Sequence, residues 1–206
     1  MNSVKKEELA ARLAPFVPEG TAPQIVGLIA HHKVRFRISR PRSSKLGDYR
    51  PPDRTAGHRI SINGDLNPFG FYITTLHEFA HLIAFEKYGM RIPPHGKEWK
   101  ITFGELLKQS LQQQIFPDEI RLELERYLKS PSASSCADHG LSRAIRMYDE
   151  QPQVFLEELP ENARFSINGS RVFQKGPRLR KRFRCLDEQN QRMYLISAIA
   201  EVEQLH

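Results

Sequence analysis

The sequence predicts an α+β protein in two parts, and three observations lead to that prediction. Residues 1–150 contain mostly helical hydrophobic periods, interrupted by one region with the period of strands. From about residue 151 the pattern changes to short alternating stretches separated by turn residues, which is typical of an antiparallel sheet. A length of 206 residues also suits one medium domain followed by a small module. We therefore expect one domain over residues 1–150 and a small antiparallel β module over residues 151–206.

The domain is expected to begin with two helices and a small sheet. The two helices are predicted over residues 4–13 and 23–32. Residues 34–40 alternate between apolar side chains and arginines, which predicts a half-buried strand with a cationic outer face. A loop rich in proline, glycine and charge is expected over residues 41–57, and a second short strand over residues 58–63.

Residues 71–88 predict a buried helix that carries His77, Glu78 and His81. The stretch has no glycine or proline, is apolar nearly all round, and ends at Gly89, a natural helix stop. Positions i and i+4 lie on one helix face, so the two imidazoles can bind a single tetrahedral Zn²⁺ ion. Glu78 lies on the flank of that face, where it can reach a water on the metal without being a ligand. Buried polar groups of this kind are costly unless something satisfies them, and a metal does so.

A catalytic zinc takes three protein ligands and keeps one position open. His95 is the best candidate for the third ligand, because it precedes a glycine and stands just before a new helical period. Glu98 and Glu105 remain alternatives, since glutamate is the third ligand at some zinc sites. Glu86 is excluded, because at 3.6 residues per turn it lies about 180° around the helix from the first histidine.

The rest of the domain is expected to be helical. Helices are predicted over residues 97–114, 117–129 and 141–148. Trp99 begins an apolar stripe in the first of these, which we interpret as core rather than as a substrate groove. Two helices, a small sheet and a helix with the H-E-x-x-H motif follow the usual order of a zincin-like metalloprotease core.

The β module is predicted to contain a hairpin and further strands. Residues 164–167 and 171–175 form the hairpin, which the pair Gly176-Pro177 is expected to end. Further strands are expected over residues 179–186, 192–197 and 200–203. Together they predict a small antiparallel barrel or sandwich.

The charge of the chain indicates a polyanionic partner, most simply nucleic acid. The formal net charge is +7, and residues 175–184 contain six positive side chains and no negative one. Those six residues are Lys175, Arg178, Arg180, Lys181, Arg182 and Arg184. If the run is one strand, its arginines line one face and suit a phosphate backbone. The alternative is a solvated edge strand whose charges prevent aggregation.

Several classes of protein are not expected. The first ten residues are charged and lack the apolar core of a secretory signal, and no apolar run approaches membrane-spanning length. Cys136 and Cys185 are the two cysteines, and they form no CxxC pair. This argues against a disulfide scaffold or a cysteine zinc ribbon. We therefore expect a cytoplasmic protein with no membrane partner.

The motif His77-Glu78-Phe79-Ala80-His81, followed by His95-Gly96-Lys97-Glu98-Trp99, resembles the SprT-like metalloproteases. That family includes Spartan-type proteases, which digest proteins crosslinked to DNA. The resemblance covers roughly residues 20–110 and extends weakly to residue 150. It implies that His77, His81 and His95 bind one zinc ion and that Glu78 is the general base. Many bacterial relatives end in a cysteine zinc ribbon, whereas this chain has only Cys185 there, so a second zinc is not expected.

The leading hypothesis is an intracellular zinc endopeptidase that acts on protein substrates, including DNA-bound or DNA-crosslinked proteins. Zincins commonly hold substrate as an added strand, and residues 34–40 are the expected sheet edge. One alternative is a nucleic-acid-binding protein that uses a zinc-stabilised scaffold, although a scaffold has no need of Glu78. Another is a small-molecule zinc amidohydrolase, which the basic charge and the open loop disfavour.

Overall fold

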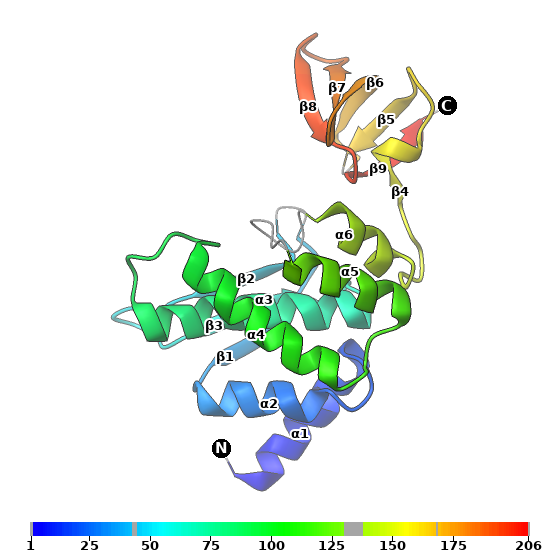
Figure 1. Ribbon diagram of the computed structural model, residues 1–206. Coiled ribbons are helices and arrows are strands. Elements are labelled where there is room, and N and C mark those ends of the chain that lie inside the picture. Colours follow the sequence, from blue (N-terminus) through cyan, green and yellow to red (C-terminus); the bar gives the residue numbers. More distant parts are fainter. Residues whose placement is uncertain (1, 43–44, 130–137, 168, 206) are drawn as a thin grey trace. The chain divides into compact units, whose positions relative to one another are not determined.

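A small mixed sheet lies at the centre of the first part of the chain (Figure 1). The computed structural model describes residues 2–42, 45–129, 138–167 and 169–205. The chain divides into two units, Met1–Asp149 and Glu150–His206. The predicted α+β class is confirmed, with six α-helices among the described residues of the first unit and an antiparallel sheet in the second. The identification of these units as a metalloprotease domain and a basic module stays a prediction.

The sheet of the first unit has the strand order β1-β3-β2. Its strands are β1 (Arg35–Ser39), β2 (Gly47–Arg50) and β3 (Arg59–Asn63). β1 is parallel to β3, and β2 is antiparallel to it. β2 lies inside the expected loop, so that part of the prediction was wrong. The strand has four residues and two prolines follow it, which leaves no alternation for the sequence to show.

The predicted helices are confirmed, with shifts of a few residues at their ends. They are α1 (Ser3–Leu13), α2 (Ala22–His31), α3 (Pro68–Tyr88), α4 (Lys97–Gln112), α5 (Asp118–Lys129) and α6 (His139–Arg146). α3 begins three residues earlier than expected, because the Asn67 side chain accepts a hydrogen bond from the Gly70 N–H and Pro68 occupies the first turn. None of the helices in the described residues is long and apolar enough to cross a membrane.

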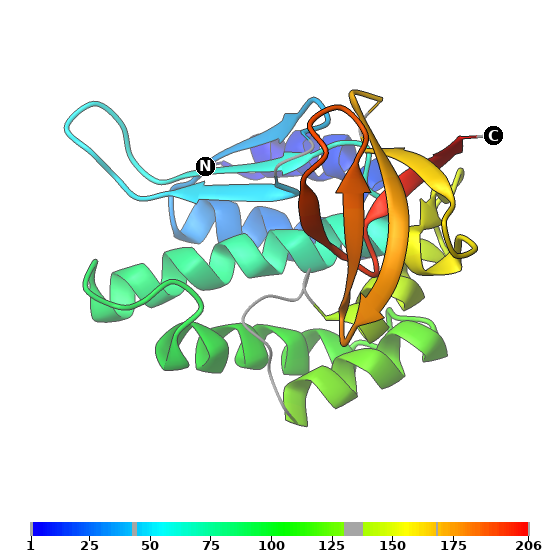
Figure 2. The same cartoon turned by 90° about the horizontal axis from the view of Figure 1, so that it is seen from above.

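α3 is the central helix of the first unit. It packs on β2 and β3 on one side and on α4 on the other (Figure 2). Most of its apolar side chains are buried, and they lie on all sides of the helix, as the sequence predicts. Its Tyr72 hydroxyl lies 2.7 Å from Gln24 Oε1 and 3.0 Å from Ser110 Oγ, so even this buried polar atom is satisfied.

The second unit is a six-stranded antiparallel sheet with the order β4-β9-β5-β6-β7-β8. Its strands are β4 (Val154–Phe155), β5 (Arg164–Ile167), β6 (Arg171–Leu179), β7 (Arg182–Asp187), β8 (Met193–Ser197) and β9 (Glu201–Leu205). The apolar side chains of the sheet form a small core that contains Phe165, Phe173 and the free thiol of Cys185. Cys136 lies outside the described residues.

The positively charged run of residues 175–184 is the end of a hairpin and not a single strand. Gly176-Pro177 was expected to end the pairing, but β6 continues through these residues with a bulge between Lys175 and Arg178. A β-carbon on Gly176 would collide with the carbonyl oxygen of Arg184, so glycine permits the close approach of β6 and β7. The chain reverses further on, at Arg180, which has a φ of 54°.

Candidate metal centre

Three histidines converge on one point of the first unit. α3 places His77 and His81 one turn apart, and the loop before α4 supplies His95. The Nε2 atoms are 3.2 Å apart for His77 and His81, 3.1 Å for His81 and His95, and 3.0 Å for His77 and His95. His95 adopts a left-handed φ of 58° and lies inside a turn that is closed by a hydrogen bond from the Gly96 N–H to the Pro93 carbonyl. This turn directs the third imidazole back to the other two.

The three nitrogens suit a metal ion. Nitrogens bound to a tetrahedral zinc at about 2.1 Å lie about 3.4 Å from one another, close to the separations observed. Burial lowers the pKa of His77 to about 3 and that of His81 to about 4, with smaller contributions from the neighbouring imidazoles. Burial also lowers the pKa of His95. The rings are therefore neutral near pH 7, which leaves lone pairs available for a metal.

The alternative third ligands do not join this group. Among the described residues, the only set of three or more potential metal-binding side chains is His77, His81 and His95. Glu98 and Glu105 lie outside it. Glu86 forms ion pairs elsewhere, with one oxygen 2.7 Å from His32 Nδ1 and the other 3.5 Å from His58 Nε2.

Trp99 packs against all three histidines. Its ring centroid lies 4.6 Å from that of His77, 5.3 Å from that of His81 and 4.7 Å from that of His95. Phe103, one turn further along α4, stacks on the indole at 4.9 Å. Trp99 is 1% exposed, as expected of a core residue. It also holds the three imidazoles in place, a role that the apolar stripe alone did not indicate.

Glu78 is buried beside the first histidine and faces β2. The backbone N–H of Tyr49 donates a hydrogen bond to its carboxylate. Burial raises the pKa of Glu78 to about 7, and the Asp48 carboxylate adds to that effect, whereas the Tyr49 N–H, Arg42 and Lys45 oppose it. A carboxyl group of this kind can accept and release a proton near neutral pH.

Gly47 is a site residue that the sequence analysis missed. A β-carbon there would lie 2.5 Å from Glu78 Oε1, 2.8 Å from Glu78 Cγ and 2.9 Å from Thr74 Cγ2. β2 therefore passes directly against Glu78, and only glycine fits at this point. The sheet edge next to the site is β2, whereas β1, the strand expected to hold substrate, forms the opposite edge. The only sequence signal was a glycine in a charged loop.

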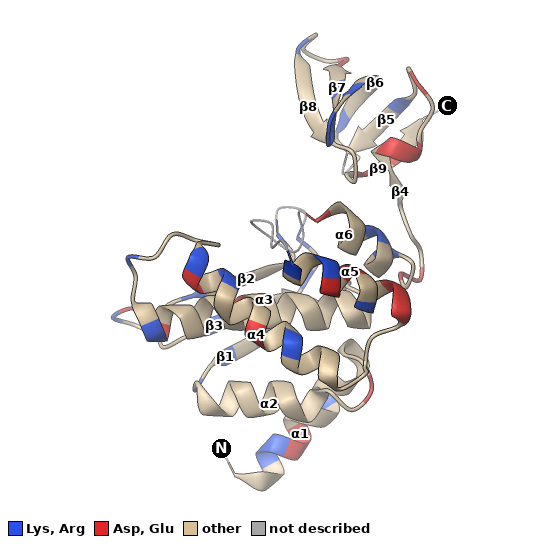
Figure 3. Cartoon of the chain, in the orientation of Figure 1, with Lys and Arg blue, Asp and Glu red and all other residues tan. Residues whose placement is uncertain are grey.

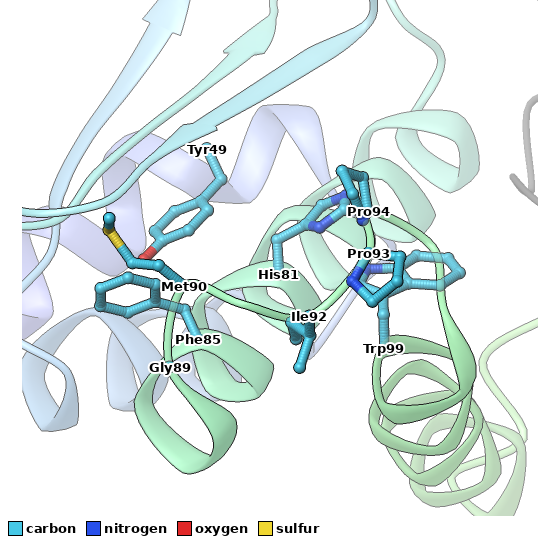
Figure 4. A pocket seen from close by; sticks show the side chains of 9 residues that line it. All are labelled: Tyr49, His81, Phe85, Gly89, Met90, Ile92, Pro93, Pro94 and Trp99. Atoms are coloured by element: carbon cyan, nitrogen blue, oxygen red, sulfur yellow. The ribbon is translucent and has the colours of Figure 1, made fainter.

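A pocket opens beside the metal centre, between β2, the end of α3 and the loop that follows it (Figure 4). His81 and Trp99 belong both to this pocket and to the histidine cluster. The residues that line it are Tyr49, His81, Phe85, Gly89, Met90, Ile92, Pro93, Pro94 and Trp99.

Most of the basic residues of the second unit occur along β6 and β7 and in the turn between them (Figure 3). Arg180, Lys181, Arg182 and Arg184 are exposed, and the buried Phe183 lies on the other face of β7, as the alternation predicts.

Lys175 departs from the expectation of a nucleic-acid contact. It is 4% exposed, and its Nζ donates to the carbonyl oxygens of Leu159 at 2.5 Å and Glu157 at 3.4 Å. Its charge is therefore used inside the second unit. Arg178 is exposed, but its guanidinium lies 3.6 Å from Glu157 Oε2 and donates to the Arg180 carbonyl. The roles assigned to the metal-site and basic residues stay predictions.

Comparison with known proteins gives partial matches to proteins named SprT. The protein of Pseudomonas fluorescens strain Pf0-1 is 35% identical over 81 residues, which cover 36% of this chain and 49% of that protein. The protein of strain SBW25 is 32% identical with the same coverage. That of Glaesserella parasuis serovar 5 is 48% identical over 31 residues, 15% of this chain and 19% of that protein.

The chain spans about half the length of the Pseudomonas relatives that it matches. No family model matches the chain, and no solved structure matches it. The partial matches agree with the resemblance that the histidine motif indicates. In sequence, the chain is therefore SprT-like.

Proposed function

We propose that the first unit is a zinc-dependent endopeptidase of the SprT-like type, with a zincin-like core. One observation carries the proposal: three neutral imidazoles converge beside a buried glutamate at β2, which among the described strands is an edge strand. A metal site that only stabilises a fold needs its metal ligands and has no need of a further glutamate such as Glu78. A buried carboxyl group with a raised pKa is costly for stability, which supports a chemical role for Glu78.

Zinc is the metal that the donor set favours. Three protein ligands with one remaining position are the arrangement of catalytic zinc sites, and His77, His81 and His95 would hold it. A bound zinc would supply Lewis-acid polarisation of the scissile carbonyl and would lower the pKa of the attacking water.

The protein's own groups would perform the proton transfers and hold the substrate. Glu78 would accept a proton from the attacking water and then give it to the leaving amine. β2 would bind an extended peptide as an additional strand, because it pairs with β3 on one side only among the described strands. Trp99 and Phe103 would keep water away from the inner side of the imidazoles.

DNA-bound or DNA-crosslinked proteins are the proposed substrates. The support is the group of exposed basic residues at the β6–β7 hairpin, namely Arg180, Lys181, Arg182 and Arg184. Such a cluster would bind phosphates regardless of sequence. A peptidase attached to it would be concentrated near proteins on DNA.

His95→Ala should remove most of the bound zinc. Loss of a partner that only orients a ligand typically weakens metal binding 10- to 100-fold, so loss of a ligand should weaken it by more than about a hundredfold. The measurement is the zinc content of the purified protein and its zinc affinity. His31→Ala, which changes a histidine outside the cluster, is the control. Full zinc occupancy in His95→Ala would move the third ligand to Glu98 or Glu105.

Glu78→Gln should abolish proteolysis and leave zinc binding intact. The amide keeps the shape of the side chain but cannot accept the proton, so cleavage should slow on the order of a thousandfold. Casein or histone digestion, with and without DNA, measures the effect. Glu125→Gln, on an exposed face of α5, should cleave like the wild type. Near-normal turnover by Glu78→Gln would disprove the assigned mechanism.

Gly47→Ala should lower activity by displacing the Glu78 carboxylate. The new methyl group would contact Glu78 at 2.5 Å, and a shift of about 1 Å in a catalytic group can cost about a hundredfold in rate. We expect a loss of roughly tenfold to a hundredfold in kcat with unchanged zinc content. In Gly27→Ala, where the methyl group meets open space on α2, activity should stay the same. Equal kcat values for the two variants would show that Gly47 has no bearing on Glu78.

The basic hairpin should bind DNA mainly through phosphates. Replacing Arg180, Arg182 and Arg184 with alanine should flatten the dependence of log affinity on log salt by about one unit per arginine. A salt titration of DNA binding by the wild type and the triple variant measures this difference.

The control is a triple alanine variant at Arg12, Arg121 and Arg126, which removes the same charge from helices of the first unit. If both triple variants match the wild type in affinity and slope, the hairpin arginines are a solvated face. The arginines of β1 would then be the next candidates.

A further inference from the structure

We propose that the pocket beside the metal centre selects a large apolar side chain of the substrate, next to the bond that is cleaved. This inference rests on the proposed peptidase function and adds a specificity to it. It requires that the pocket adjoin the reacting groups, exclude charge and keep its shape.

The position of the pocket meets the first requirement. One end is formed by His81, a metal-site residue, and by Trp99, which packs on all three imidazoles. The other end is formed by Tyr49 of β2 (Figure 4). A peptide paired with β2 would direct every second side chain to the face of the pocket, because side chains alternate between the faces of a strand. Since the pocket adjoins His81, the side chain that enters it would be the one next to the scissile bond.

The lining meets the second requirement. None of its members is a lysine, arginine, aspartate or glutamate. Phe85, Met90, Ile92 and two prolines supply mainly carbon surface. A charged substrate side chain would lose its hydration without gaining an opposite charge, which is unfavourable. Leucine, methionine and phenylalanine would instead leave water for an apolar surface.

A hydrogen bond and several ring contacts hold Tyr49 in place at the pocket. The Tyr49 hydroxyl lies 3.0 Å from His58 Nδ1, and His58 Nε2 lies 3.5 Å from Glu86 Oε1. The rings of Tyr49 and His58 stack at a centroid distance of 5.9 Å, and Phe85 packs edge-on against both. Tyr49 is therefore held in place by Phe85 of α3 and by His58, the residue that precedes β3.

Met90 offers a position where the preference can be altered. Met90 lines the pocket but is 77% exposed, so replacing its side chain should not disturb the core. Met90→Glu would place a carboxylate at the pocket. Met147→Glu is the matched control, since Met147 is 66% exposed and does not line the pocket.

The first measurement is cleavage of a peptide series that carries Leu, Phe, Ala, Asp or Lys at each position flanking the scissile bond. At one position, we expect wild-type kcat/KM to be at least about tenfold higher for Leu and Phe than for Asp and Lys. Met90→Glu should improve the Lys peptide relative to the Leu peptide by about tenfold or more. Met147→Glu should follow the wild type.

The second measurement is binding without cleavage, in the Glu78→Gln background. Trp99 is the only tryptophan of the chain and lines the pocket, so its fluorescence reports occupancy. The Leu peptide should bind at least about tenfold more tightly than the Lys peptide, and Met90→Glu should reduce that difference.

The two measurements separate failure of this inference from failure of the proposed function. Cleavage without an apolar preference at any position, with Met90→Glu equal to Met147→Glu, overturns the pocket inference alone. If the wild type cleaves nothing, the peptidase proposal falls. The fluorescence titration then decides the pocket: a Leu preference that Met90→Glu reduces supports it, and equal binding of all peptides overturns it.

Discussion

The burial of polar groups in α3 is the constraint on which the rest of the first unit depends. His77 is 7% exposed and Glu78 is 6% exposed, in a helix that is otherwise packed in apolar side chains. Such groups destabilise a fold unless each polar atom has a partner. β2 supplies a backbone N–H to Glu78, and the loop with His95 brings a third imidazole to the two on α3. Trp99, at the start of α4, packs its ring on all three imidazoles but gives them no hydrogen bond. The positions of these three segments therefore follow from their contacts with α3.

β2 shows how strongly this constraint acts on a short strand. The strand has four residues, yet two of them contact Glu78: the Tyr49 N–H donates to its carboxylate, and Gly47 leaves room for the same group. The Tyr49 hydroxyl also contacts His58, which in turn contacts Glu86. Glu86 also pairs with His32 just after α2. The end of α3 is thereby tied to the sheet and to α2, which fixes the edge strand relative to the metal centre.

The sequence predicted the helices and strands whose signal lies within one segment. The prediction failed where contacts between residues far apart in the sequence determine the structure. α3 and its histidines could be predicted because hydrophobicity, the i, i+4 spacing and Gly89 all lie within one segment. β2 could not, because among the described residues it pairs with β3 alone, and because Gly47 is required by its close contact with Glu78. The surroundings of Lys175 were hidden for the same reason: nothing near it in the sequence shows that its ammonium group donates to the carbonyls of residues 157 and 159.

The loop over residues 89–95 joins the histidine cluster to the pocket beside it. Gly89 ends α3 with a φ of 78°, and His95 has a φ of 58°, so the loop begins and ends in left-handed conformations that fix its course. Between these residues, Met90 and Pro93 line the pocket, and the Pro93 carbonyl anchors the turn that orients His95. A change in the length of this loop would move the third imidazole and the pocket wall together. A substitution at Met90 would therefore change the pocket wall with less disturbance than an insertion, because it would leave the position of His95 unchanged.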